Sequence, residues 1–131
     1  MSGVSLSYVN LVSEDIVSLS RFYSDLFDLE ELPDFRSEMY VALDLDGVMF
    51  GFSPPEVYDL LHIVPWRDGK GATQFMTFEV NSTTTVERLT SLAVEMGAQM
   101  LREPYDTSYG SRQAVLADPD GNVFRINYQH G

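Results

Sequence analysis

The chain contains the same structural unit twice. The turn sequence "DLDG" at residues 44–47 recurs as "DPDG" at 118–121, an offset of 74 residues, and a Phe follows each turn glycine by three positions. Upstream, residues 8–31 align with residues 75–98 at an offset of 67. A repeat that spans most of a 131-residue chain restricts the fold to two copies of one supersecondary unit.

Each copy is predicted to begin with a strand and to continue into an amphipathic helix. Apolar residues recur every three or four positions in both segments: Ile16, Leu19, Phe22, Tyr23, Leu26 and Phe27 in the first, and Val86, Leu89, Leu92, Ala93 and Met96 in the second. Residues 13–15 offer capping groups for the first helix. Ser82 or Thr83 caps the second helix, and Gly97 ends it.

Three short alternating stretches follow each helix and are predicted to be strands. They cover residues 31–36, 39–45 and 48–53 in the first half, and 99–105, 112–117 and 122–129 in the second half. Each half is therefore a β-α-β-β-β unit of about 55 residues, which is too small to bury its own helix and sheet stably.

We therefore expect a single α+β domain over residues 1–131, built from half-repeats at about 4–53 and 72–129. The halves are expected to pair within the chain or across a dimer. The linker at 54–71 has Pro and Gly at its ends and one possible helical turn around residues 56–61, so we predict a crossing segment or a flap there rather than a domain.

Composition narrows the classes of partner. Twenty acidic and eight basic side chains give a formal charge of -12, which repels phosphate backbones and anionic lipids, so we expect neither nucleic acid nor membrane as a partner. A cationic small molecule would be attracted, although this charge also serves solubility alone. No cysteine is present and no apolar run approaches the roughly 20 residues of a spanning helix. We expect a cytoplasmic protein.

The tandem units, the segments "SED" and "FYSDLF", and the turn "DPDGN" resemble the vicinal oxygen chelate superfamily. This superfamily includes glyoxalase I, extradiol dioxygenases, fosfomycin-modifying enzymes and bleomycin resistance proteins. The resemblance covers nearly the whole chain and implies a cupped mixed sheet and a homodimer. In the metal-using members it also implies a divalent ion, bound by side chains of the first and last strands of the two halves.

By this resemblance, the metal-ligand positions are Tyr8 and Phe75 on the first strands and Gly51 and Arg125 on the last strands. Phe has no donor atom, a neutral Tyr is a poor donor, Gly has no side chain, and Arg brings a fixed positive charge. The two histidines lie in the linker and near the C-terminal end, and are expected to face solvent or bond locally. The sequence therefore predicts that neither the usual metal nor another cofactor is bound.

Strand alternation directs one face of each strand to its helix and the other face to the cup. The residues predicted to bind ligand are Tyr8, Asn10, Met49, Phe75, Thr77, Glu79, Arg125 and Asn127 on strands, with Trp66 and Tyr109 in loops. Aromatic faces, amides, one carboxylate and one guanidinium suit a planar or moderately polar organic ligand. The loop aromatics are equally explained as loop anchors, and the first-strand rings as plugs of an empty cup.

An inward-facing guanidinium needs an anionic partner, because an unpaired buried charge is costly. Two partners are open for Arg125: the carboxylate of Glu79, or an anionic group on a ligand. If Glu79 pairs with Arg125, the cup favours neutral or cationic guests. If it does not, Arg125 is an anion clamp.

Four functional hypotheses follow. The first is a metal-free small-molecule binding protein of the bleomycin-resistance type, related to antibiotic resistance, which holds an aromatic or cationic organic ligand. The alternative is a metal-independent isomerase or lyase, with Glu79 as general base and Arg125 stabilising an oxyanion. A metal enzyme with displaced ligands would use Glu79, Glu56 or His62. A structural partner domain would fill the cup with its own side chains.

Overall fold

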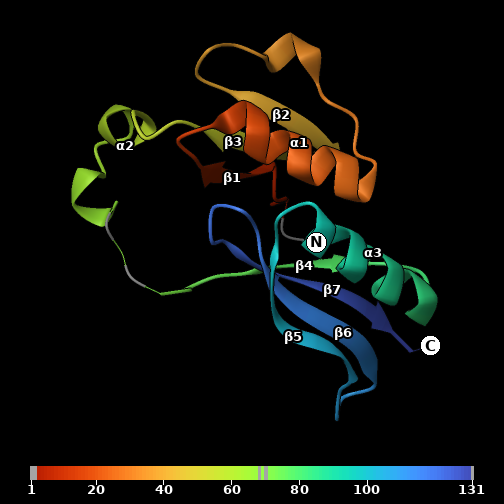
Figure 1. Ribbon diagram of the computed structural model, residues 1–131. Coiled ribbons are helices and arrows are strands. Elements are labelled where there is room, and N and C mark those ends of the chain that lie inside the picture. The colour runs from red at the N-terminus through yellow and green to blue at the C-terminus, as the bar shows by residue number, and fades with distance from the viewer. Residues whose placement is uncertain (1–2, 68, 70, 131) are drawn as a thin grey trace. The chain divides into compact units, whose positions relative to one another are not determined.

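The computed structural model describes residues 3–67, 69 and 71–130. The chain divides into two compact units, Met1–Gly69 and Lys70–Gly131, which we call the N-terminal and the C-terminal unit. The division falls inside the predicted linker. Each unit combines helix with a mixed sheet, so the predicted α+β fold class is confirmed (Figure 1).

The N-terminal unit has a three-stranded sheet in the order β1-β3-β2. Its elements are β1 (Tyr8–Val12), α1 (Ile16–Phe27), β2 (Val41–Leu45) and β3 (Val48–Ser53). The β1 strand runs parallel to β3, and β2 runs antiparallel to β3. Helix α1 lies against one face of this sheet and contacts β2 and β3 (Figure 1). Among the described residues of this unit, no helix covers the opposite face (Figure 1).

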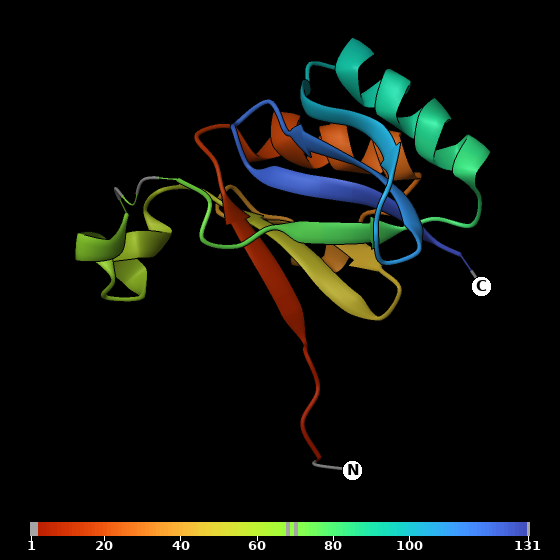
Figure 2. The same cartoon turned by 90° about the horizontal axis from the view of Figure 1, so that it is seen from below.

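The C-terminal unit has a four-stranded sheet in the order β4-β7-β6-β5. Its elements are β4 (Met76–Glu79), α3 (Thr83–Glu95), β5 (Gln99–Asp106), β6 (Ser111–Ala117) and β7 (Val123–Gln129). The β4 strand is parallel to β7, and the other two pairings are antiparallel. Helix α3 runs along one face of the sheet and contacts β5, β6 and β7 (Figure 2).

Strand register confirms the internal repeat. In the N-terminal unit, Asn10 of β1 lies opposite Gly51 of β3, and in the C-terminal unit Thr77 of β4 lies opposite Arg125 of β7. These pairs are related by the same offsets, 67 and 74, that align the two halves of the sequence. The first-strand and last-strand positions of each copy are therefore neighbours within their own sheet.

Both helices begin where the capping signals predicted. The Asp15 side chain accepts a hydrogen bond from the Ser18 amide at 3.0 Å, and Ser82 Oγ accepts one from the Thr85 amide at 3.0 Å. After α3 the chain passes through Gly97 with a φ of +106°, a conformation that favours glycine and ends the helix as predicted.

The predicted strand at residues 31–36 is wrong. The stretch keeps one β-bridge, between Glu31 and Leu43, beside which the Leu32 amide donates to the Ala42 carbonyl at 2.8 Å, and Pro33–Phe35 forms the 3-10 helix η1. Pro33 has no amide hydrogen for a strand ladder and starts the helical turn instead. Arg36 donates to both carboxylate oxygens of Glu31 at 2.7 and 2.9 Å, and this hydrogen bonding holds the pKa of Glu31 below its ordinary value.

The linker contains the predicted helical turn, now α2 (Val57–Leu60), followed by a second 3-10 helix, η2 (Val64–Trp66). This segment extends away from the three-stranded sheet of its unit (Figure 1). Its apolar side chains are open to solvent, with Leu60 73% and Trp66 79% exposed. Among the described residues, no helix has the length and apolar character needed to cross a bilayer.

Each core lies between a helix and the inner face of its sheet. In the N-terminal unit the fully buried rings are Tyr23 of α1 and Phe50 and Phe52 of β3. In the C-terminal unit Phe124 and Ile126 of β7 are fully buried. These strand residues are those that alternation assigned to the helix side, so their neighbours along each strand point to the other face.

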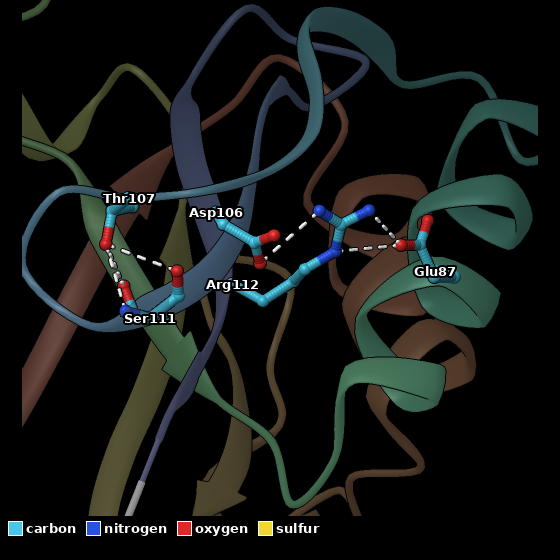
Figure 3. Close-up of polar contacts among 5 residues, drawn as sticks. All are labelled: Glu87, Asp106, Thr107, Ser111 and Arg112. Carbon is cyan, nitrogen blue, oxygen red and sulfur yellow. Dashed lines mark hydrogen bonds and ion pairs between the residues drawn. The ribbon is translucent and has the colours of Figure 1, made fainter.

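On the helix side of β6, the charged residues are paired with one another. Arg112 donates from Nε to Glu87 of α3 at 3.0 Å and also lies 3.5 Å from an oxygen of Asp106 (Figure 3). Thr107 and Ser111 close the β5–β6 turn through their hydroxyls at 2.9 Å. Because Arg112 points toward α3, the next residue, Gln113, points to the opposite face of the sheet.

Candidate functional site

In the N-terminal unit, a hydrogen bond between two side chains lies over Gly51, the last-strand position of the first copy. The Tyr40 hydroxyl donates to Asn10 Oδ1 at 2.9 Å and lies 3.6 Å from Met49 Sδ. A Cβ atom added to Gly51 would collide with both the Tyr40 hydroxyl and Asn10 Oδ1. Burial, with a smaller effect of Tyr8, raises the pKa of Tyr40, so its hydroxyl stays protonated and acts as a donor.

Sequence reasoning missed Tyr40, although it named Tyr8, Asn10 and Met49 for the same face. The sequence placed Tyr40 inside the alternating stretch 39–45, whereas the structure puts it just before β2, in a turn closed by a bridge to Ser37. One signal was present. A glycine inside a strand, here Gly51, often marks the close approach of another group.

We predict that Gly51→Ala breaks the Tyr40–Asn10 hydrogen bond. The added methyl group forces the Tyr40 ring aside, and the lost bond lowers the free energy of unfolding by about 1 kcal/mol, measured by urea denaturation. In a Tyr40→Ala background the same substitution is expected to cost less, because only the Asn10 side chain still obstructs the added methyl group and the Tyr40–Asn10 hydrogen bond is already absent. An equal cost in both backgrounds would contradict this account.

In the C-terminal unit, five side chains meet on the face that α3 does not cover, and we call them the Arg125 cluster: Phe75, Thr77, Tyr109, Gln113 and Arg125. Arg125 donates from Nε to Thr77 Oγ1 at 2.9 Å, and from Nη1 to the Tyr109 hydroxyl and Gln113 Oε1 at 3.4 Å each. Its guanidinium carbon lies 5.0 Å from the centroid of the Phe75 ring, within cation-π range. The cluster contains one charge and four uncharged side chains.

Gln113 was not predicted, and it fixes the orientation of the cluster. Only 2% of its surface is exposed, its carbonyl oxygen faces Arg125, and its Nε2 donates to the Tyr105 hydroxyl at 2.7 Å. Flipping the amide would place two donors against each other, so the assigned orientation is the favourable one. The β6–β7 register sets Gln113 opposite Asn127, two residues along β7 from Arg125 and on the same face, so its place in the cluster follows only once that register is known.

The structure answers the question of Arg125's partner. Glu79 accepts hydrogen bonds from Asn127 Nδ2 at 2.8 Å and from the Gln129 amide at 2.7 Å. No acidic side chain among the described residues forms an ion pair with Arg125. The register explains the result, because it sets Thr77 beside Arg125 and Glu79 beside Asn127. Asn127 Oδ1 is buried and has no hydrogen-bond partner within the described part of the chain.

The predicted site residues therefore fall into separate groups. Within the C-terminal unit, Phe75, Thr77, Tyr109 and Arg125 come together, and Glu79 and Asn127 form a neighbouring pair. Within the N-terminal unit, Asn10 and Met49 both lie beside the Tyr40 hydroxyl. Tyr8 lies opposite Met49 in the strand register and is 55% exposed. Trp66 lies in η2, and its side chain takes part in none of these contacts.

The positions that would bind a divalent ion do not fit one. Tyr8 and Phe75 supply only a neutral phenol and a hydrocarbon ring, and Arg125 is a cation that donates in every hydrogen bond it makes. Gly51 has no side-chain donor atom, and the side chains of Tyr40 and Asn10 fill the space beside its Cα. Within residues 3–67, 69 and 71–130, no three His, Asp or Glu side chains form a group able to hold a metal.

The chain matches the family profile of the Glyoxalase/Bleomycin resistance protein/Dioxygenase superfamily over residues 5–126. It is similar to the crystal structure of a glyoxalase/bleomycin resistance protein/dioxygenase family enzyme from Burkholderia phytofirmans PsJN, with 37% identity, a TM-score of 0.92, and coverage of 95% of this chain and 98% of that one. No curated protein gave a significant match.

Two further solved structures share the fold at lower identity. A glyoxalase-related enzyme from Fulvimarina pelagi has 21% identity and a TM-score of 0.78, with 95% of this chain and 88% of that chain covered. A lactoylglutathione lyase from Agrobacterium tumefaciens has 17% identity and a TM-score of 0.72, with 98% and 96% covered. The repeat, the two mixed sheets and the profile match agree: this chain belongs to the glyoxalase/bleomycin resistance protein/dioxygenase superfamily.

Proposed function

We propose that this chain binds an aromatic organic molecule without the help of a metal ion, as a small-molecule binding protein of the bleomycin-resistance type. The observation that carries the proposal is the Arg125 cluster, in which an exposed aromatic ring, hydroxyls and a guanidinium share one sheet face. Rings of this kind give stacking area, and the polar groups give orientation.

The proposal narrows the ligand class expected from the sequence, which was aromatic or cationic. Arg125 has no carboxylate partner among the described residues, so a cationic guest on this face would meet a like charge. The net charge of -12 still attracts cations to the protein as a whole, but it gives them no partner at this cluster.

A metal-independent isomerase or lyase that uses Glu79 and Arg125 is less well supported. Both carboxylate oxygens of Glu79 already accept hydrogen bonds, one from Asn127 and one from the Gln129 amide. A general base must instead reach the proton that it removes. We therefore propose a binding function rather than a catalytic one. A homodimeric assembly and a cytoplasmic location remain predictions that accompany this proposal.

We predict that Phe75→Ala weakens the binding of aromatic compounds about 3- to 10-fold, the effect of losing one ring contact. The probes are benzoate, benzamide and their naphthalene counterparts, titrated by NMR chemical-shift changes into chelator-treated protein. Phe35→Ala is the matched control, because Phe75 and Phe35 are similarly exposed, at 54% and 50%, and Phe35 lies outside the cluster. Affinity should be unchanged in that variant.

Three results would overturn the proposal. The first is that none of the aromatic probes binds the wild-type protein. The second is a stoichiometric metal, found by elemental analysis, whose removal abolishes binding. The third is conversion of a bound probe to product. Native mass spectrometry of the same sample reports the mass of the assembly and so tests the predicted homodimer.

A further inference from the structure

We propose that Arg125 is an anion clamp, and that the aromatic ligand carries a carboxylate or a similar oxyanion which docks on its guanidinium. This inference rests on the proposed function and specifies the chemistry of the same site.

The charge of Arg125 is solvated within the described chain only by neutral groups. Its Nε and Nη1 atoms donate to a threonine hydroxyl, a tyrosine hydroxyl and an amide oxygen, and Nη2 donates to no described residue. Neutral acceptors orient a guanidinium but leave its charge uncompensated. An oxyanion that reaches Nη2 would form a charge-assisted hydrogen bond, which is about twice as strong as a neutral one.

The neighbouring hydroxyls add to this attraction. Thr77 Oγ1 and the Tyr109 hydroxyl both accept hydrogen bonds from Arg125, so their own hydrogens are free to point toward an incoming anion. Gln113 has no carboxylate that would repel the anion. Its amide is held in place by hydrogen bonds to Arg125 and Tyr105. The five side chains of the cluster therefore present several donors and no anionic group; Glu79, the carboxylate next along this face, already accepts from Asn127 and from the Gln129 amide.

The Phe75 ring sets the expected size and shape of the ligand. It lies against the guanidinium carbon at 5.0 Å and is 54% exposed, so part of its surface remains available for stacking. A flat ring bonded directly to a carboxylate could contact Phe75 while its oxygens approach Arg125. An arylcarboxylate satisfies both features at once.

The sequence of the C-terminal unit, which carries the cluster, is only slightly acidic despite the net charge of the protein. The sequence of the N-terminal unit carries thirteen acidic and three basic side chains, whereas that of the C-terminal unit carries seven and five. Most of the excess negative charge therefore belongs to the other unit's sequence. Long-range repulsion of an anion is screened beyond about 8 Å at physiological salt.

The test compares benzoate with benzamide, its uncharged analogue of nearly the same shape. We expect wild-type protein to prefer benzoate, and Arg125→Gln to weaken benzoate about 10- to 100-fold while leaving benzamide within about 3-fold, the range set by a hydrogen bond to a charged group. Arg88→Gln is the matched control, since it removes the same charge from the same unit at an exposed position on α3, away from the cluster's face of the sheet. Its benzoate affinity should fall less than 3-fold.

The outcomes separate the two proposals. If benzamide binds as tightly as benzoate, or if both Gln variants weaken benzoate equally, the clamp is wrong while aromatic binding stands. If acetate binds like benzoate and Phe75→Ala has no effect, the clamp stands and the aromatic function is wrong. If no probe binds, both are wrong. Should Arg125→Gln fail to fold, Thr77→Val and the wild-type preference for benzoate over benzamide give the same decision.

Discussion

Replacing Phe50 with Ala is expected to lower the free energy of unfolding by about 3 to 5 kcal/mol, the range for deleting a buried aromatic ring. Phe50 has no exposed surface, and its ring centroid lies 4.9 Å from that of Tyr23 and 4.7 Å from that of Phe52. These neighbours are large and rigid, so they cannot collapse into the cavity that the substitution leaves. Urea denaturation followed by far-ultraviolet circular dichroism measures the loss.

Two matched substitutions test whether burial is the cause. Phe124→Ala removes the residue at the same place in the second copy, also with no exposed surface, and is expected to cost a similar amount. Phe35→Ala removes a ring that is 50% exposed, and is expected to cost less than about 1 kcal/mol. Equal losses for Phe35→Ala and Phe50→Ala would contradict the assigned core.

Most of the architecture could be predicted from the sequence because each repeated signal has a local cause. Caps at Asp15 and Ser82, apolar stripes at helical spacing, and alternating strands act within a few residues of one another. The failure at residues 31–36 also has a local cause. Alternation favoured a strand there, but Pro33 removes a ladder donor and starts a 3-10 turn.

The site could be predicted only in part, because alternation gives the face of a side chain but not its partner. It placed Thr77, Glu79 and Arg125 on one face correctly, and left open whether the arginine meets the carboxylate. The answer depends on the parallel register of β4 and β7, which puts Thr77 opposite Arg125. Tyr40 belongs to the predicted stretch 39–45, but alternation there gives no partner for its hydroxyl, so its contact with Asn10 could not be predicted in this way.

The second large effect on the free energy of unfolding is expected at the DPDG turn, residues 118–121. Asp118→Ala is expected to lower the free energy of unfolding by about 2 to 3 kcal/mol, since hydrogen bonds to a buried charged acceptor are lost and their donors are left behind. Asp118 is 3% exposed, and its Oδ1 accepts from the amides of Asp120 at 2.9 Å and Asn122 at 3.0 Å. The measurement is again urea denaturation, with Asp118→Asn expected to cost less because an acceptor oxygen remains.

The matching aspartate of the first copy supplies the control. Asp44 is exposed and makes one longer contact, from its Oδ1 to the Gly47 amide at 3.3 Å. Asp46 and Gly47 have φ values of +50° and +88°, so the two-residue hairpin closes through its own backbone. Asp44→Ala should therefore cost less than about 0.5 kcal/mol. If the two substitutions cost the same, the buried carboxylate is not what stabilises the β6–β7 loop, because the two turns share the Asp-x-Asp-Gly pattern and their first aspartates differ in burial.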